Sequence, residues 1–164
     1  MENKRIFKAT EYKNIKELLY GSAEKYGDKT AFTIKHQNGK EIEYDNKSYK
    51  DLLEDVNEFG AGLFDLGLKG KRIAVIGKNR YEWAMGYYAV VNGLGVVVPL
   101  DKGLPKEEIE LSLKRSKADA IICEGNYVDT VKEIMKNGNT VLKTCISMDE
   151  IESSENIIDL KDLI

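Results

Sequence analysis

Two glycine-rich segments contain the residue types that bind phosphate in many proteins. The first is residues 67–72, GLKGKR, and the second is residues 92–95, NGLG. The first lacks a Ser or Thr after its lysine and precedes an apolar run typical of a strand, whereas a phosphate loop precedes a helix. The second also leads into a strand, whereas a dinucleotide fingerprint follows one. We therefore interpret both segments as turns between a helix and a strand.

Two basic residues, Lys78 and Arg80, follow the apolar run 73–76, which is typical of a strand buried on both faces. Open α/β sheets bind ligands at the carboxyl ends of such strands. These two cations could therefore bind an anionic ligand. The alternative is that they are simply solvated, as basic residues in a turn usually are.

Histidine and cysteine offer little for catalysis or metal binding. The one histidine, His36, lies beside a predicted turn, where no neighbouring residue could act as its catalytic partner. We interpret it as a solvated edge residue, and a single histidine argues against a transition-metal site. Cys123 and Cys145 both fall in predicted strands, so we expect buried, reduced thiols. The sequence predicts no metal site and no catalytic residue.

The charges of the chain are nearly balanced, with 25 basic and 28 acidic residues and a net charge of −3 in 164 residues. That balance gives no electrostatic reason to expect binding to nucleic acid or to an anionic membrane. The apolar runs are too short to span a bilayer, and the N-terminus lacks the apolar segment of a secretory signal. We expect a cytoplasmic protein with no transmembrane segment and no nucleic-acid partner.

A strand–helix–strand unit lies at the centre of the chain. After the strand at 73–76, Asn79 and Glu82 have the spacing of a capping box. The helix expected at residues 80–92 has these side chains at helical spacing, which fit a core more often than a ligand pocket: Trp83, Tyr87, Tyr88 and Val91. Gly93 has the place of a helix stop, and the run 96–98 predicts a second, parallel strand.

The N-terminal third predicts a polar segment, a helix, a β-hairpin and a long helix. These elements are expected at residues 1–14, 15–26, 30–36 with 42–44, and 48–66. Asn38-Gly39 between alternating strands is a strong hairpin signal, and Ser48 with Asp51 resembles a capping box. Gly60 and Gly62 inside the long helix cost about 1 kcal/mol each. Our hypothesis is that close packing on a sheet requires both.

The C-terminal half alternates helices and strands. Pro105 suits the first position of a helix that ends near Lys117, and Asn126 is placed to cap a helix that stops at Gly138. The other elements expected are strands at 118–123 and 140–146 and a weak helix at 159–164. This alternation predicts an α/β fold with a layered, mostly parallel βαβ sheet and an N-terminal β-hairpin, all in one domain of residues 15–164.

The order of these elements, together with particular residues, resembles the N-terminal part of the adenylate-forming, or AMP-binding, acyl-CoA synthetase and ligase superfamily. The residues that carry the resemblance are Ser48-Tyr49, Leu52, Leu66-Gly67, residues 70–75, Asn79, Glu82-Trp83, Gly93, Val98-Pro99-Leu100, Glu108-Ile109 and Ser116-Lys117-Ala118. The resemblance covers about residues 11–164. Within the superfamily the chain looks most like a bacterial fatty-acyl-CoA ligase.

The resemblance implies an AMP-forming ligase, in which a carboxylate attacks the α-phosphate of ATP with Mg²⁺ present and coenzyme A then displaces AMP. The family's phosphate loop, adenine-binding motif, magnesium-binding glutamate and C-terminal lysine do not occur in this sequence. We therefore expect an N-terminal fragment, truncated before the phosphate loop, that is inactive by itself. ATP, Mg²⁺ and coenzyme A would belong to the full-length parent, and this chain would hold no cofactor.

Two pairs of residues are candidate ligand contacts by this resemblance. Asp101 and Lys102 follow the strand that ends near Val98, in a loop that can approach coenzyme A in related enzymes. Asn79 and Trp83 begin a helix that would lie near the acyl pocket. For Asp101 and Lys102, the alternative is an ordinary surface loop.

The expected partner is the remainder of the parent polypeptide, and the apolar surface it would cover could also cause self-association. Two other hypotheses stay open. The chain could be a free-standing α/β binding or scaffolding module without catalysis, or an unrelated doubly wound domain that binds a nucleotide. The reading frame after Ile164 separates the fragment from the module, and calorimetry with a nucleotide tests the third hypothesis.

Overall fold

An apolar strand, β3 (Arg72–Ile76), lies inside a five-stranded sheet whose order is β4-β3-β5-β6-β7. All neighbouring strands in this sheet are parallel. The other strands are β4 (Val96–Pro99), β5 (Ala120–Cys123), β6 (Thr144–Ser147) and β7 (Ile157–Asp159). The structure is a computed structural model that describes residues 10–164. Residues 1–9 of the polar segment predicted at 1–14 therefore lie outside the described residues.

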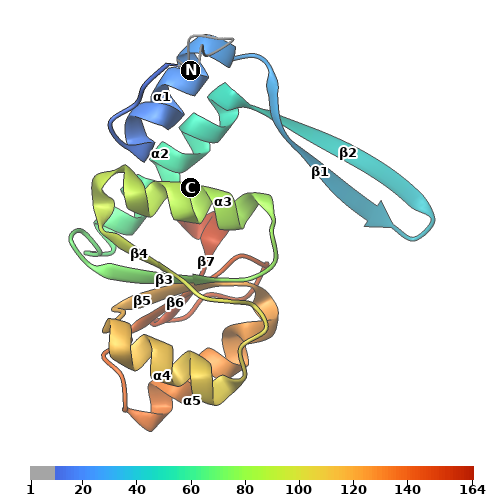
Figure 1. Cartoon of the computed structure of the whole chain (residues 1–164). Helices are drawn as coiled ribbons and strands as arrows, with labels where there is room; N and C mark the ends of the chain where they lie inside the picture. The colour runs from blue at the N-terminus through green and yellow to red at the C-terminus, as the bar shows by residue number, and fades with distance from the viewer. Residues whose placement is uncertain (1–9) are drawn as a thin grey trace, which may run out of the picture.

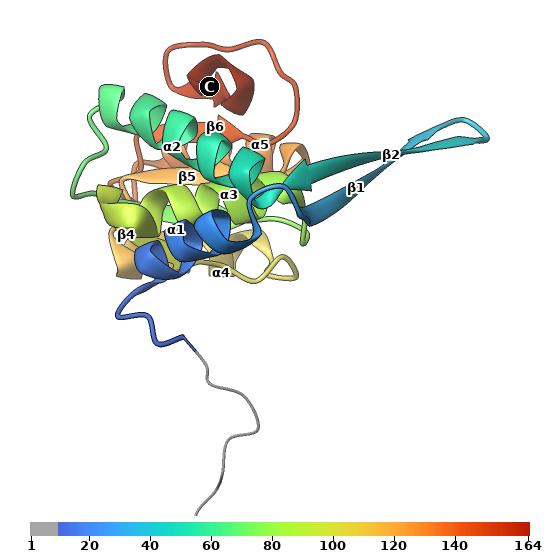
Figure 2. The same cartoon turned by 90° about the horizontal axis from the view of Figure 1, so that it is seen from above.

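Helices cover both faces of this sheet (Figure 1). The helices are α1 (Ile15–Tyr26), α2 (Tyr49–Asp65), α3 (Tyr81–Ala89), α4 (Lys106–Ser116) and α5 (Val128–Asn137), with a π-turn at Val90–Leu94 and 3₁₀ turns at Gly125–Tyr127 and Leu160–Leu163. Figure 2 shows α1, α2 and α3 on one face of the sheet, and Figure 1 places α4 and α5 on the other.

Each face of the sheet has its own apolar core because successive side chains of a strand point to opposite faces. Ile73 and Val75 of β3 pack with α1, α2 and α3, whereas Ala74 and Ile76 pack with α4 and α5. The same alternation places Cys123 and Cys145 in the second core, where both are buried free thiols, as expected. The predicted α/β class with a parallel sheet is confirmed.

The N-terminal hairpin extends away from the helices as a twisted two-stranded ribbon (Figures 1 and 2). It consists of β1 (Thr30–Asn38) and β2 (Glu41–Ser48), paired antiparallel, and Gly39 in the turn has a left-handed φ of 63°. At its base the predicted capping box of α2 is confirmed. The Ser48 backbone N–H donates to Asp51 at 2.8 Å, and the Asp51 backbone N–H donates to the Ser48 hydroxyl at 3.1 Å.

The predicted cap of α3 is wrong, and the aromatic residues expected in the core are only partly buried. Tyr81, Met85 and Ala89 are fully buried, whereas Trp83 and Tyr88 are half-buried and pack against the same core. Arg80 is the N-cap residue and makes no side-chain cap bond. Asn79 makes no capping bond, and the Glu82 carboxylate accepts from the Arg80 side chain. The helix is apolar almost all round, so periodicity could not select its inner face.

Of the two glycines in α2 only Gly62 is closely packed, and it packs on a turn and not on a sheet as predicted. A Cβ atom on Gly62 would lie 2.3 Å from the Leu163 carbonyl oxygen, so the C-terminal 3₁₀ turn packs directly on this residue. A Cβ atom on Gly60 would meet nothing within 4 Å. The hypothesis was therefore wrong for Gly60, which faces open space and not a sheet.

The C-terminal half differs from the prediction in its details. Pro105 is the N-cap residue of α4 and not its first helical residue, and no side chain caps the turn at Asn126. The strand predicted at 140–146 begins only at Thr144. The edge strand β7 has three residues, too few for a recognisable alternation, and it was not predicted.

Candidate functional site

The strand order has a reversal at β3, because β4 lies on one side of it and β5 on the other. In open parallel sheets, ligands bind outside the carboxyl ends of the strands at such a point. Here the loop 77–80 leaves β3 beside the segment that follows β5. The Glu124 backbone N–H donates to the Ile76 carbonyl at 3.1 Å, and the Lys78 backbone N–H donates to the Glu124 carboxylate at 3.2 Å.

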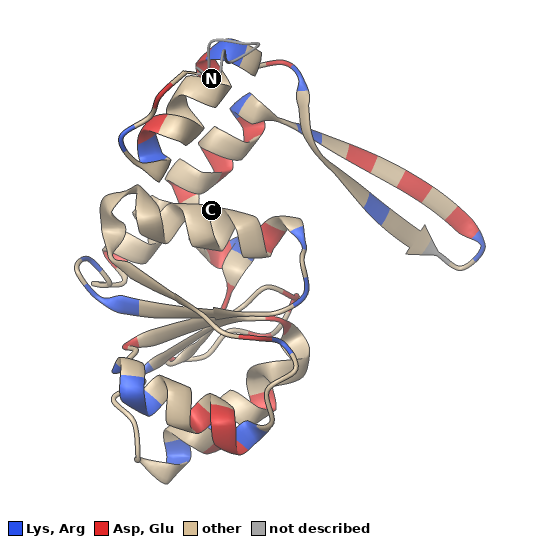
Figure 3. Cartoon of the chain, in the orientation of Figure 1, with Lys and Arg blue, Asp and Glu red and all other residues tan. Residues whose placement is uncertain are grey.

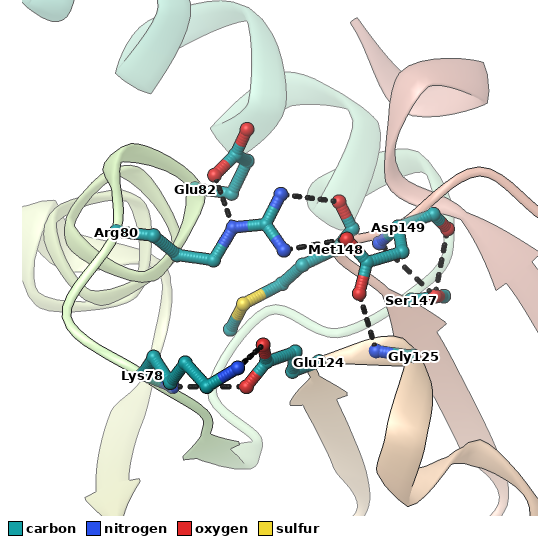
Figure 4. Close-up of polar contacts among 8 residues, drawn as sticks. All are labelled: Lys78, Arg80, Glu82, Glu124, Gly125, Ser147, Met148 and Asp149. Atoms are coloured by element: carbon teal, nitrogen blue, oxygen red, sulfur yellow. Dashed lines mark hydrogen bonds and ion pairs between the residues drawn. The ribbon is translucent and has the colours of Figure 1, made fainter. Parts of the chain in front are cut away.

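Arg80 lies at the centre of a polar cluster at this carboxyl edge (Figure 4). Its Nε donates to Glu82 at 2.6 Å, and its Nη1 donates to Asp149 at 2.5 Å. The second oxygen of Asp149 accepts from the Gly125 backbone N–H at 2.7 Å. The Ser147 hydroxyl donates to the Asp149 carbonyl at 2.8 Å and so fixes the turn that carries Asp149. One guanidinium therefore joins the loops that follow β3 and β6.

The protonation states in this cluster follow from its contacts. Partial burial would lower the pKa of Arg80, but the hydrogen bonds with Glu82 and Asp149 outweigh burial and raise it. Burial would raise the pKa of Asp149, but Arg80 and the Gly125 N–H hold it below the usual value. Both groups stay charged at neutral pH and neutralise each other.

Lys78, the other cation of this loop, is also paired. Its Nζ lies 3.3 Å from the Glu124 carboxylate. Carboxylates of the chain itself therefore occupy both basic residues that could have bound an anion. The carboxyl edge thus has three carboxylates for its two cations, and this cluster holds loops in place and leaves neither cation unpaired for a phosphate.

A cavity of about 590 Å³ opens beside this cluster, between the hairpin and the start of α3. Its lining residues are Phe32, Thr33, Ile34, Lys35, His36, Asn79, Arg80, Tyr81, Glu82, Trp83 and Ala84. The structure thus brings together Asn79 and Trp83, the two residues proposed to lie near an acyl pocket. His36 is exposed at one wall of the cavity, consistent with its interpretation as a solvated residue.

The wall of this cavity is fixed by a contact that the sequence did not reveal. The Tyr81 hydroxyl donates to Asp55 of α2 at 2.6 Å, and Lys47 of β2 lies 3.0 Å from the same carboxylate oxygen. The Phe32 ring packs edge-on against Tyr81 with 5.3 Å between the ring centroids. Burial and the neighbouring Asp55 raise the pKa of Tyr81, so its hydroxyl stays a donor. No local sequence signal joins positions so far apart in the chain.

Trp83 has a second aromatic contact, because it stacks on Tyr87 with 5.5 Å between the ring centroids and 11° between the ring planes. Tyr87 itself does not line the cavity. The stack therefore fixes the orientation of the indole ring that faces the cavity.

Asp101 and Lys102 lie in another place, in the loop after β4. The Asp101 carboxylate accepts from the Gly103 backbone N–H at 2.6 Å and stabilises the turn. The Lys102 carbonyl accepts from the Tyr127 hydroxyl. The side chains of Asp101 and Lys102 are exposed. Neither residue lines the cavity beside α3. The structure therefore separates the two pairs of predicted contacts.

Within residues 10–164, no group of three or more His, Cys, Asp or Glu side chains is placed to hold a metal ion. In the same part of the chain, none of the helices has the length and apolar character needed to cross a membrane.

A parallel sheet of this order, covered by helices on both faces and with a cavity beside its carboxyl edge, defines a doubly wound α/β domain that can bind a ligand there. The chain belongs to the AMP-binding enzyme family, whose match covers residues 19–162. The resemblance found in the sequence is confirmed, and the hypothesis of an unrelated doubly wound domain is wrong.

The chain is similar to fatty acyl-CoA synthetase A of Dictyostelium discoideum, with 34% identity over 115 residues that make up 70% of this chain and 17% of that protein. Among solved structures, it is similar to a long-chain-fatty-acid–CoA ligase of Archaeoglobus fulgidus, with 20% identity, a TM-score of 0.75, and coverage of 99% of this chain and 32% of that one. Coronafacic acid ligase of Pectobacterium brasiliense gives 21% identity and a TM-score of 0.77, covering 92% of this chain and 29% of that one.

The two solved structures show the fold alone, because their identities are low. The chain spans about a fifth of the length of the curated relatives, with values of 17% and 20% for the first two. The whole relatives therefore contain much that this chain does not.

Proposed function

We propose that this chain is the N-terminal α/β part, about residues 15–164, of an AMP-forming ligase that joins a fatty acid to coenzyme A. The observation that carries the proposal is family membership over residues 19–162, together with 34% identity to a fatty acyl-CoA synthetase. In this chemistry the acid first becomes an acyl-adenylate at the expense of ATP, and a thiol then takes the acyl group. We propose the cytoplasm as its location.

The contribution of this chain would be binding and positioning. Phe32, Ile34 and Trp83 give the cavity beside α3 an apolar wall that fits an alkyl chain, and Asn79 adds a hydrogen-bonding amide. ATP, Mg²⁺ and coenzyme A would act in the longer protein, where positively charged groups stabilise the phosphates. Within residues 10–164 the cations at the carboxyl edge are paired, so those groups would come from the remainder of the polypeptide. Lys102, exposed in its loop, could meet a phosphate of coenzyme A as a point charge.

The acyl part of the proposal can be tested on this chain, because Trp83 is its single tryptophan and lines the cavity. Titration with decanoate should change the tryptophan fluorescence to saturation, and Ile34→Asn should weaken the binding about tenfold by removing apolar contact. A Val141→Asn variant, which replaces an exposed apolar side chain outside the cavity with the same residue, is the matched control. Equal affinity of all three proteins, or no fluorescence change, would exclude the cavity as an acyl site.

The catalytic part needs a separate assay. The isolated chain should not exchange pyrophosphate into ATP with any fatty acid, whereas the product of a reading frame that continues beyond Ile164 should. Exchange by the isolated chain would contradict the proposal. In the longer protein, Lys102→Ala should weaken coenzyme A binding measured by calorimetry and leave fatty-acid binding unchanged, and an unaltered affinity would remove Lys102 from the site.

We also propose that the hairpin is an association surface, for the remainder of the polypeptide or for a second copy. An isolated two-stranded hairpin is marginally stable, and this one exposes Ile42 by 49% and Tyr44 by 63%. Sedimentation at rising concentration should show self-association of this chain, and Ile42→Thr with Tyr44→Thr should abolish it. A strictly monomeric chain would contradict the proposal.

A further inference from the structure

Two basic runs of the sequence, Lys69-Gly70-Lys71-Arg72 and Lys114-Arg115-Ser116-Lys117, meet at the amino edge of the sheet. The first leads into β3 and the second ends α4. The two runs are held together through Asp119, whose backbone N–H donates to the Arg72 carbonyl at 2.8 Å. In Figure 3 the ribbon is blue, the colour of Lys and Arg, at the start of β3 and at the end of α4.

A shallow depression of about 440 Å³ lies between these runs. Its lining residues are Arg72, Val96, Val98, Arg115, Ser116 and Lys117. The three cations are exposed, and within residues 10–164 none of their side chains has an ion pair. The nearby Asp119 does not neutralise them, because its carboxylate pairs with Lys71 at 3.4 Å and accepts from the Arg72 backbone N–H at 3.0 Å. We call these three cations with Val96 the amino-edge patch.

The helix dipole explains only part of this patch. Cations at the C-terminus of α4 are favourable there, which accounts for Arg115. Lys117, however, occupies the left-handed position after the helix with a φ of 53°, a position that glycine usually fills. Arg72 belongs to a strand and not to the helix. The helix alone therefore does not require three cations around one depression.

We propose that the amino-edge patch docks the protein on a membrane that contains anionic phospholipids. The three cations would contact headgroup phosphates, and Val96, 56% exposed on the edge strand β4, would meet the apolar boundary of the headgroup layer. The partner is an extended surface because the depression is shallow. None of the six lining residues is an aromatic on which a nucleic-acid base could stack, which favours lipid over single-stranded nucleic acid.

The distribution of charge sets one orientation on such a surface. The chain has a net charge of −3, but the hairpin itself is neutral, with Glu41, Glu43 and Asp45 matched by Lys35, Lys40 and Lys47 (Figure 3). An anionic membrane would attract the amino-edge patch, whereas the opposite, carboxyl edge has three carboxylates, Glu82, Glu124 and Asp149, against two cations. The cavity lined by Trp83 lies beside the opposite, carboxyl edge of the sheet and would stay open. The choice of a lipid surface rests on the proposed fatty-acid chemistry, since fatty acids partition into bilayers.

The test is sedimentation of this chain with vesicles of phosphatidylcholine alone and of phosphatidylcholine mixed with phosphatidylglycerol. The chain should bind the mixed vesicles only, and added salt should weaken the binding. Removing each charge should weaken it about fivefold, so Arg72→Gln, Arg115→Gln and Lys117→Gln together should weaken it about a hundredfold. Lys25→Gln, Lys40→Gln and Lys50→Gln together remove the same charge from exposed positions elsewhere and should leave it unchanged.

Further arms make every outcome decisive. Arg72→Lys with Arg115→Lys should retain binding, and circular dichroism should show that all variants are folded. Equal binding of the two triple variants, or equal binding to both kinds of vesicle, would overturn the proposal. Stronger binding to an oligonucleotide than to the mixed vesicles would overturn the choice of partner. Vesicle binding requires no acyl activation. The vesicle assay and the ligase assay can therefore fail independently of each other.

Discussion

The two edges of the central sheet carry the same kinds of basic residue but differ in what surrounds them. At the carboxyl edge, Arg80 contacts Glu82 and Asp149, and Lys78 contacts Glu124. At the amino edge, Arg72, Arg115 and Lys117 have no carboxylate partner within residues 10–164. A cation whose hydrogen bonds are satisfied inside the chain stabilises the fold, whereas an unpaired one remains available to an external anion.

Net charge alone could not reveal this difference between the two edges. A net charge of −3 gave no reason to expect an anionic partner. The net value is a sum over the whole chain, and it hides the local cluster of Arg72, Arg115 and Lys117 at the amino edge of the sheet. Arg72 and Arg115 are far apart in the sequence and meet only in the fold, so composition does not reveal this surface.

The largest expected effect is loss of the guanidinium at the carboxyl edge. Arg80→Ala should destabilise the fold by about 1–3 kcal/mol, because Glu82 loses its guanidinium donor and Asp149 keeps only the Gly125 N–H. The melting temperature should fall by roughly 2–4 °C for each kcal/mol. Arg72→Ala at the amino edge removes no internal contact of the side chain and should stay within about 0.5 kcal/mol.

Thermal unfolding followed by circular dichroism measures both variants. Arg80→Lys keeps the charge but not the forked geometry, so its stability should lie between those of Arg80→Ala and the unaltered chain. Equal stability of the Arg80→Ala and Arg72→Ala variants would break the comparison between the two edges.

A smaller effect is expected from Asp149 in acid. Its pKa in the folded chain lies below the ordinary value of 3.8, because Arg80 and the Gly125 N–H outweigh the opposing effect of burial. The unfolded chain therefore takes up this proton at a higher pH than the folded chain. The stability that this carboxylate contributes is complete above about pH 4 and is lost as the pH falls through its folded pKa.

Asp149→Asn should remove this part of the acid sensitivity. Urea midpoints at neutral pH and near pH 3 should therefore differ less in the variant than in the unaltered chain. Asp65→Asn changes an exposed carboxylate at the end of α2 and serves as the control. An acid response unchanged by Asp149→Asn would show that Asp149 is not stabilised by its contacts at the carboxyl edge.

Local signals predicted much of this fold. The bounds of α1 follow from its apolar stripe, the hairpin turn from Asn38-Gly39, and the start of α2 from Ser48 with Asp51, because each depends on residues close in the chain. The inner face of α3 and the strand β7 were not predictable in this way. Helix α3 has no polar side that would define its inner face, and β7 is too short to show the alternation of apolar and polar residues typical of a strand.

The candidate site shows the same limit more sharply. Asn79 and Trp83 could be proposed together because they share one helix start. Phe32 of the hairpin lines the same cavity, and Asp149 lies 69 residues after its partner Arg80. Neither of these residues could be assigned to the site from the sequence. Gly60 and Gly62 lie in one helix and look alike in the sequence. Only the fold shows that Leu163 packs on Gly62 and that no atom lies within 4 Å of a Cβ on Gly60.

The smallest expected effects come from the exposed lysine of one ion pair at each edge. Lys78 lies 3.3 Å from Glu124 with its side chain 71% exposed, and Glu124, only 13% exposed, also accepts from the Lys78 backbone N–H, which a substitution retains. Lys71 lies 3.4 Å from Asp119 with its side chain 49% exposed. Exposed pairs contribute about 0–1 kcal/mol, so Lys78→Gln and Lys71→Gln should each change the melting temperature by no more than roughly 2–4 °C. Lys71→Gln should also release Asp119 to pair with a cation of the amino-edge patch and thereby weaken vesicle binding, whereas Lys78→Gln should not. Equal loss of vesicle binding in both variants would mean that the two edges do not differ in the way proposed.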